Sequence, residues 1–166
     1  MNYFYLDASA FAKYYCPELG SDLIIALMQS LSGDQARRLI VTSMTIAETI
    51  AVLNRRRNEL RLSDTEFGSV VPRLLADISQ LTLWRIHDDD LLNAVVQIVA
   101  HNLNASDGLH LHTAQRLDRL LQRAQQGRLV LVAADQRLLR AAEAEQIPTL
   151  NPETATAQDV SQLILA

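Results

Sequence analysis

Four acidic side chains occupy positions where an enzyme built on a parallel sheet would carry its chemistry: Asp7, Glu48, Asp107 and Asp135. Taken singly, an acid at a helix N-terminus has an ordinary structural role, because it satisfies free backbone N–H groups and meets the positive end of the helix dipole. Taken together, carboxylates brought to one place repel one another until a cation neutralises them. A cluster of acids without Cys or His therefore indicates a site for Mg²⁺ or Mn²⁺, which prefer oxygen ligands.

Alternating apolar and amphipathic segments predict the elements that would position these acids. Strands are predicted at 2–6, 39–42, 81–86, 128–134 and 147–150, and helices at 9–15, 21–31, 64–81, 90–103, 107–126 and 135–145, with a further helix running on from Thr45. This order predicts an α/β fold, a three-layer α/β/α sandwich with a mostly parallel central sheet covered on both faces. The active crevice of such a sheet lies at the carboxyl ends of its strands, where we expect Asp7 and Asp135.

Two helix starts carry the spacing of a capping box, in which a hydroxyl and an acid three residues later exchange hydrogen bonds with the backbone. One pair is Ser63 with Glu66, and the other is Thr45 with Glu48. Under this interpretation Glu48 could be the far half of a helix cap and nothing more.

The length of 166 residues fits one domain with a substantial core, and neither a repeat nor a Gly/Ser/Pro-rich linker divides it. We expect the domain to span residues 1–152. Residues 153–166 would form a helical tail packed on that domain.

Composition and charge exclude several classes of protein. No apolar run approaches the about 20 residues that cross a bilayer, and Asp7 interrupts the first apolar run before it could form a signal peptide. The single cysteine, Cys16, suits a reducing compartment, so we expect a cytoplasmic protein with no membrane partner. The net charge of −4 argues against a general nucleic-acid coat protein, although it is compatible with a nuclease.

Four segments, in this order, resemble the PIN-domain ribonucleases and, within them, the VapC-type toxins of toxin–antitoxin pairs. They are "YLDASAFAKYY", "TSMTIAETIAVLNR", "LNASDGLHLHTA" and "LVLVAADQRLLRAAEAEQIPTLNP". The order and spacing of the resemblance extend from residue 2 to about residue 152. The third segment is the most specific of the four.

The resemblance implies a fold and an activity. A PIN-like sandwich would hold Mg²⁺ or Mn²⁺ on Asp7, Glu48, Asp107 and Asp135, with Ser9 as an accessory hydroxyl. The protein would be a metal-dependent endoribonuclease, in which a water activated by the metal cleaves RNA to a 5′-phosphate and a 3′-hydroxyl. A cognate antitoxin and a homodimer are implied as partners. The family often carries Thr or Ser two residues before the last acid, whereas this chain has Ala133.

Other charged residues have both a functional and a structural interpretation. Four arginines could contact RNA phosphates or could belong to solvated helix faces: Arg55, Arg56, Arg57 and Arg116. The run "DDD" at 88–90 is expected to cap a helix. His110 and His112 point to different faces of one helix, so they cannot share a metal and we expect packed or surface histidines. His110 lies one turn from Asp107 and could approach the cleft.

Two rival functions remain at this point. A PIN scaffold that binds RNA or a protein partner without cutting is compatible with the missing hydroxyl at Ala133. A phospho-acceptor receiver domain also has an α/β fold with acids at its strand ends. Such domains carry a conspicuous lysine late in the chain, whereas the only lysine here is Lys13, which argues against that class.

Overall fold

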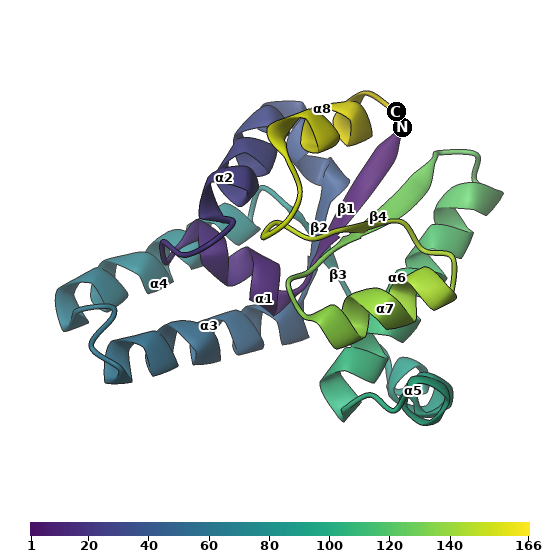
Figure 1. Cartoon of the computed structure of the whole chain (residues 1–166), viewed down its shortest axis with the longest axis horizontal. Helices are drawn as coiled ribbons and strands as arrows, with labels where there is room; N and C mark the ends of the chain where they lie inside the picture. Colours follow the sequence, from purple (N-terminus) through teal and green to yellow (C-terminus); the bar gives the residue numbers. More distant parts are fainter.

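The computed structural model describes residues 1–166 and shows a five-stranded, all-parallel sheet between two layers of helices (Figure 1). The strands are β1 (Asn2–Leu6), β2 (Leu39–Thr42), β3 (Thr82–Trp84), β4 (Arg128–Val132) and β5 (Thr149–Leu150). The predicted three-layer α/β/α sandwich is confirmed, with shorter strands than the sequence indicated at β3, β4 and β5.

Eight α-helices and two short 3-10 helices connect and cover the strands. They are α1 (Ala8–Phe11), η1 (Ala12–Tyr14), α2 (Ser21–Ser30), η2 (Gly33–Arg38), α3 (Ser43–Asn58), α4 (Asp64–Ile78), α5 (Asp88–His101), α6 (Ala105–Arg123), α7 (Gln136–Ala144) and α8 (Ala157–Leu165). None of the helices combines the length and the apolar character that crossing a bilayer would require.

The strand order β3-β2-β1-β4-β5 makes β1 the central strand. From β1 the chain passes to β2 on one side, and it later returns to β4 on the other side. All five residues of β1 pair in parallel with β4, from Asn2 with Arg128 to Leu6 with Val132. The order of the sheet therefore reverses between β1 and β4, and their carboxyl ends form the switch point where α/β proteins bind ligands.

Side chains alternate between the two faces of the sheet and build two separate cores. Phe4 and Leu6 belong to a cluster with residues of α1 to α4 and α8, whereas Tyr5 belongs to a cluster with residues of α6 and α7. Figure 1 shows the same division, with α5, α6 and α7 on the side of the sheet away from α2 and α8.

Arg38 joins the C-terminal helix to the first strand, and Figure 1 shows the two chain ends side by side. Arg38 is only 8% exposed, and its guanidinium donates hydrogen bonds to the carbonyls of Asn2 (2.8 Å) and Ile164 (2.9 Å). Asn2 also donates to the carbonyl of Leu163. Helix α8 thus packs against β1 and α2. The division of the chain into a domain of residues 1–152 and a tail of residues 153–166 stays a prediction.

One of the two predicted capping boxes is confirmed and the other is wrong. Ser63 and Glu66 exchange the expected hydrogen bonds at the start of α4. At α3 the box consists of Thr42 and Thr45 instead, so the helix begins three residues earlier than the Thr45–Glu48 spacing suggested. Thr42 prevails because it ends a fully buried strand and already has the extended backbone of an N-cap.

Replacing Arg38 with Met should lower the free energy of unfolding by about 2 kcal/mol, because two carbonyls lose a charged donor in a buried place. It should also raise amide exchange in α8. Arg37→Met is the matched control, since Arg37 is exposed and makes one such bond, to the Leu81 carbonyl. Denaturant titration and hydrogen exchange measure both effects, and equal losses in the two variants would contradict the assigned role of Arg38.

Candidate metal centre

All four predicted acids line one cleft at the carboxyl edge of the sheet. Its walls include Asp7, Glu48, Asp107 and Asp135, together with Ser9 and Arg55. Asp7 directly follows β1 and still donates its backbone N–H to the Val132 carbonyl of β4 (2.9 Å). Asp135 follows β4, so two of the acids come from the strands that flank the switch point.

Asp7 and Asp135 are helix caps as well as residues of the cleft. Asp7 Oδ2 accepts hydrogen bonds from the Ser9 backbone N–H (3.0 Å) and from the Ser9 hydroxyl (2.6 Å). Asp135 Oδ1 accepts from the backbone N–H groups of Arg137 and Leu138. Each cap uses one carboxylate oxygen, which leaves the other oxygen of each acid for the cleft. The structural and functional interpretations of these two residues are therefore compatible.

Ser9 connects the two loops that follow β1 and β4. Its hydroxyl donates to Asp7 Oδ2 and accepts a hydrogen bond from the backbone N–H of Ala134 (2.8 Å). Ala133, where the family often has a hydroxyl, is fully buried in the apolar cluster on the α6 and α7 side of the sheet. The hydroxyl that Ser9 supplies is thus the one that orders the loop before Asp135.

Glu48 lies in the second turn of α3, and its carboxylate is not used for capping. The Thr42–Thr45 box satisfies the start of the helix, so the Glu48 side chain can turn into the cleft. Its Oε2 lies 2.8 Å from Nε2 of His110. Burial raises the pKa of Glu48, but the hydrogen bond and the charge of His110 lower it more, so the carboxyl titrates below its usual range.

Asp107 is the third residue of α6, where Asn104 caps the helix and holds the acid. Asn104 Oδ1 accepts from the Asp107 backbone N–H (2.8 Å), and Asn104 Nδ2 donates to Asp107 Oδ2 (2.8 Å). Burial, and then the charges of Asp135 and Asp7, raise the pKa of Asp107 to about 6. The cleft therefore holds more negative charge than its own residues neutralise.

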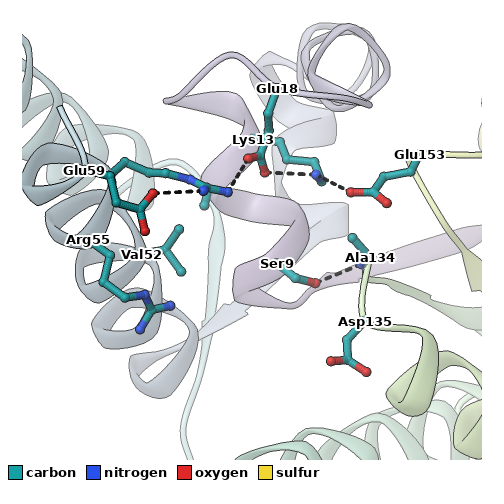
Figure 2. Close-up of a pocket in the computed structure, with 11 residues that line it drawn as sticks. Ser9, Lys13, Glu18, Val52, Arg55, Glu59, Ala134, Asp135 and Glu153 are labelled. Atoms are coloured by element: carbon teal, nitrogen blue, oxygen red, sulfur yellow. Dashed lines mark hydrogen bonds and ion pairs between the residues drawn. The ribbon is translucent and has the colours of Figure 1, made fainter. Parts of the chain in front are cut away.

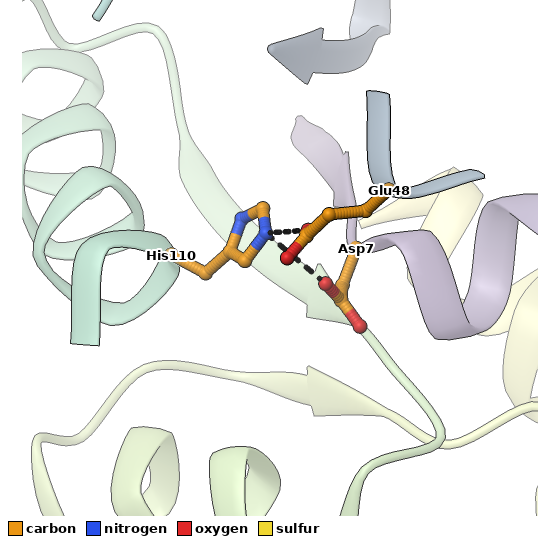
Figure 3. A group of neighbouring side chains, drawn as sticks. All are labelled: Asp7, Glu48 and His110. Carbon is orange, nitrogen blue, oxygen red and sulfur yellow. Dashed lines mark hydrogen bonds and ion pairs between the residues drawn. The ribbon is translucent and has the colours of Figure 1, made fainter. Parts of the chain in front are cut away.

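His110, one turn from Asp107, reaches the acids of the cleft. It is 1% exposed, and its Nε2 lies 2.8 Å from Glu48 Oε2 and 3.3 Å from Asp7 Oδ1 (Figure 3). Although burial lowers its pKa, Tyr5 and the two carboxylates raise the pKa of His110 well above its usual value. The expectation of a packed histidine is correct, but the packing places it against two acids of the cleft. Its spacing of three residues from Asp107, one helical turn, was the available signal.

The other acidic run, 88–90, is a helix cap as expected. Asp90 accepts a hydrogen bond from the His87 backbone N–H (2.9 Å) at the start of α5. It also accepts two hydrogen bonds from Arg116 (2.6 and 2.7 Å), and His112 Nε2 lies 3.4 Å from it. This group lies between α5 and α6 and belongs to the packing of these two helices.

Of the four candidate RNA-binding arginines, Arg55 lines the cleft, and the other three already have partners. Arg56 pairs with Glu18 (2.6 Å), Arg57 lies over the Phe67 ring, and Arg116 is bound to Asp90. Arg55 also lines an adjoining pocket, where Figure 2 shows it across from Asp135. RNA contact stays a prediction for all four, and the geometry favours Arg55.

The residues of the cleft fit a hard divalent cation. Four carboxylates supply oxygen donors, and carboxylate oxygens of Asp7 and Glu48 lie within 4.8 Å of each other. The raised pKa of Asp107 indicates negative charge that a cation would neutralise.

The chain belongs to the PIN domain family, whose model matches residues 4–144. Members of this family are generally metal-dependent nucleases. No curated protein shows significant sequence similarity to the chain.

Two solved structures share the fold at low sequence identity. PAE2754 from Pyrobaculum aerophilum superposes with a TM-score of 0.62 at 18% identity, over 99% of this chain and 96% of its own. A toxin–antitoxin complex from Klebsiella pneumoniae contains a chain with a TM-score of 0.56 at 14% identity, over 89% of this chain and 96% of its own. At these sequence identities, the structural similarity to the two proteins establishes the fold of this chain and nothing about its activity.

The raised pKa of Asp107 predicts a pH dependence of stability in EDTA. Since the folded protein holds this proton more tightly than the unfolded chain, the stabilisation is complete below about pH 4 and is lost as pH rises through about 6. Solvent screening of this partly exposed group leaves an effect of about 1 kcal/mol. Asp107→Asn should not lose stability in this pH range, because it has no carboxyl to ionise. At neutral pH in EDTA it should therefore be more stable than the wild type.

Denaturant titrations of both proteins in EDTA at several pH values measure the difference. Asp22→Asn, at an exposed acid of α2, is the control and should follow the wild type. Parallel pH profiles for the wild type and Asp107→Asn would show that the acids of the cleft do not repel one another.

Proposed function

We propose that this PIN domain is a metal-dependent endoribonuclease, acting in the cytoplasm as the toxin of a toxin–antitoxin pair. The observation that carries the proposal is the convergence of Asp7, Glu48, Asp107 and Asp135 on one cleft, where burial and the neighbouring negative charges raise the pKa of Asp107. The family supports nuclease chemistry, and the Klebsiella pneumoniae neighbour, solved as a toxin–antitoxin complex, supports an antitoxin as partner.

The proposed mechanism assigns a task to each side chain of the cleft. The four acids would hold Mg²⁺ or Mn²⁺, which when bound would activate water and offset the charge of the phosphate. Asp7 and Asp135 would keep their orientation through their caps, and Ser9 would fix the distance between their loops. Arg55, free of the ion pairs of its neighbours, would bind a substrate phosphate at the mouth of the cleft.

RNA cleavage tests this proposal directly. Protein purified away from any antitoxin should cut a mixed RNA pool with Mg²⁺ or Mn²⁺ and should not cut in EDTA. Asp107→Asn should lower the rate at least about 100-fold, since loss of a ligand should cost no less than loss of a residue that supports one. Arg55→Ala should raise KM more than it lowers kcat, and Asp22→Asn should be unaffected.

A PIN scaffold without catalysis is the second candidate, because Ala133 lacks the hydroxyl often found in the family. It predicts that folded protein binds RNA and leaves it intact with every divalent cation. Cleavage that persists in EDTA or in Asp107→Asn would instead indicate chemistry outside the cleft and would reject the metal mechanism.

A second copy of the chain is proposed as a further partner, held through α5. Five large apolar side chains on this helix are between 53% and 76% exposed: Leu91, Leu92, Val95, Val96 and Val99. Their spacing places them along one stripe, whereas monomers rarely expose such a continuous apolar patch. The same stripe on two copies would form a self-complementary interface, as a twofold dimer requires.

Val96→Asp should therefore convert a dimer into a monomer in sedimentation velocity, because it places a charge in the middle of the stripe. Leu19→Asp is the matched control, since Leu19 is 69% exposed and lies outside α5. An oligomeric state that Val96→Asp leaves unchanged would exclude α5 as the interface.

A further inference from the structure

A buried hydrogen-bonded chain runs from the centre of the sheet to one acid of the cleft. The Tyr5 hydroxyl lies 2.5 Å from Nδ1 of His110, and Nε2 of the same ring lies 2.8 Å from Glu48 Oε2. Tyr5 is fully buried on β1, and His110 is 1% exposed on α6. Three elements distant in sequence thus meet through one imidazole, which Figure 3 shows between α6 and the acids.

The partners of the ring determine where its hydrogen atoms lie. In the neutral ring, the Tyr5 hydroxyl donates to Nδ1, so the hydrogen stays on Nε2 and is donated to Glu48. In the charged ring both nitrogens donate, and Nε2 still donates to Glu48. In either state the Nε2 lone pair is unavailable to a cation, so the ring acts on the carboxylate.

Glu48 needs such a partner more than the other three acids do. Asp7 is held by Ser9, Asp107 by Asn104, and Asp135 by backbone N–H groups, all within three residues of the acid. Glu48 has a longer side chain in the second turn of its helix, and its bond to His110 joins residues 62 apart in sequence.

We propose that His110, oriented by Tyr5, is a positioning residue that presents the Glu48 carboxylate to the cation of the proposed nuclease site. The inference rests on that proposed function and adds two residues that act through Glu48. Residues that support ligands in this way alter metal affinity by about 10-fold to 100-fold when they are removed.

Mn²⁺ affinity of the full-length protein, measured by electron paramagnetic resonance of the free ion, tests the inference without an activity assay. His110→Asn should weaken Mn²⁺ binding by about 10-fold to 100-fold. Tyr5→Phe, which keeps the buried ring and removes only the hydroxyl, should weaken it by a smaller factor. His112→Asn, two residues along the same helix and directed at Asp90, is the matched control and should bind as the wild type does.

A double-mutant cycle separates positioning from a general structural effect. If His110 acts through Glu48, then His110→Asn should cause a much smaller loss of Mn²⁺ affinity in a Glu48→Gln background, where only its 3.3 Å contact with Asp7 is left to contribute. Additive losses in the double variant would overturn the inference. So would a nitrogen hyperfine coupling to bound Mn²⁺ that disappears in His110→Asn, since it would make His110 a direct ligand.

Failure of this inference and failure of the proposed function give different results. Unchanged Mn²⁺ binding in folded His110→Asn and Tyr5→Phe, with binding lost in Asp107→Asn, would overturn the inference and leave the nuclease site intact. Wild-type protein that does not bind Mn²⁺ would overturn both. Circular dichroism melts establish folding, and Tyr5→Phe decides the question if His110→Asn does not fold.

Discussion

Repulsion between like charges is the constraint that the rest of this structure accommodates. Four carboxylates share one cleft, and burial together with the charges of Asp135 and Asp7 raises the pKa of Asp107. The fold holds them in place by giving each acid local hydrogen bonds, through a helix cap, a neighbouring hydroxyl or a buried imidazole. Stability is thereby distributed unevenly, because the cores on both faces of the sheet offset a cleft that is unfavourable without a cation.

The topology of the sheet explains why residues so far apart in the chain meet there. With β1 in the centre, the carboxyl ends of β1 and β4 are neighbours, and α3 begins directly after β2, on the other side of β1. The long helix α6 then adds its first two turns, which carry Asp107 and His110, from the opposite layer. Each acid is thus at or near the start of a helix, where the helix dipole favours negative charge.

The sequence was sufficient to place a site residue wherever a local rule determines its position in the fold. The strand-end rule was sufficient to expect Asp7 and Asp135 at one edge, and all four acids could be named before their geometry was known. The role of Glu48 in a cap was mistaken, because two hydroxyls compatible with capping, Thr42 and Thr45, lie three residues apart. The spacing of His110 from Asp107 indicated that His110 could approach the cleft, but its partners Tyr5 and Glu48 lie more than sixty positions away, which no local pattern reports.

The central position of β1 has a consequence for the order in which the molecule can assemble. This strand is made before the other four, yet its partner β4 consists of residues 128–132, so one edge of β1 stays unpaired until those residues have been made. The acids are spread from Asp7 to Asp135, and the last wall of the cleft exists only after Asp135 has been made. Until then, the nascent chain contains the first three acids but not the complete cleft in which all four converge.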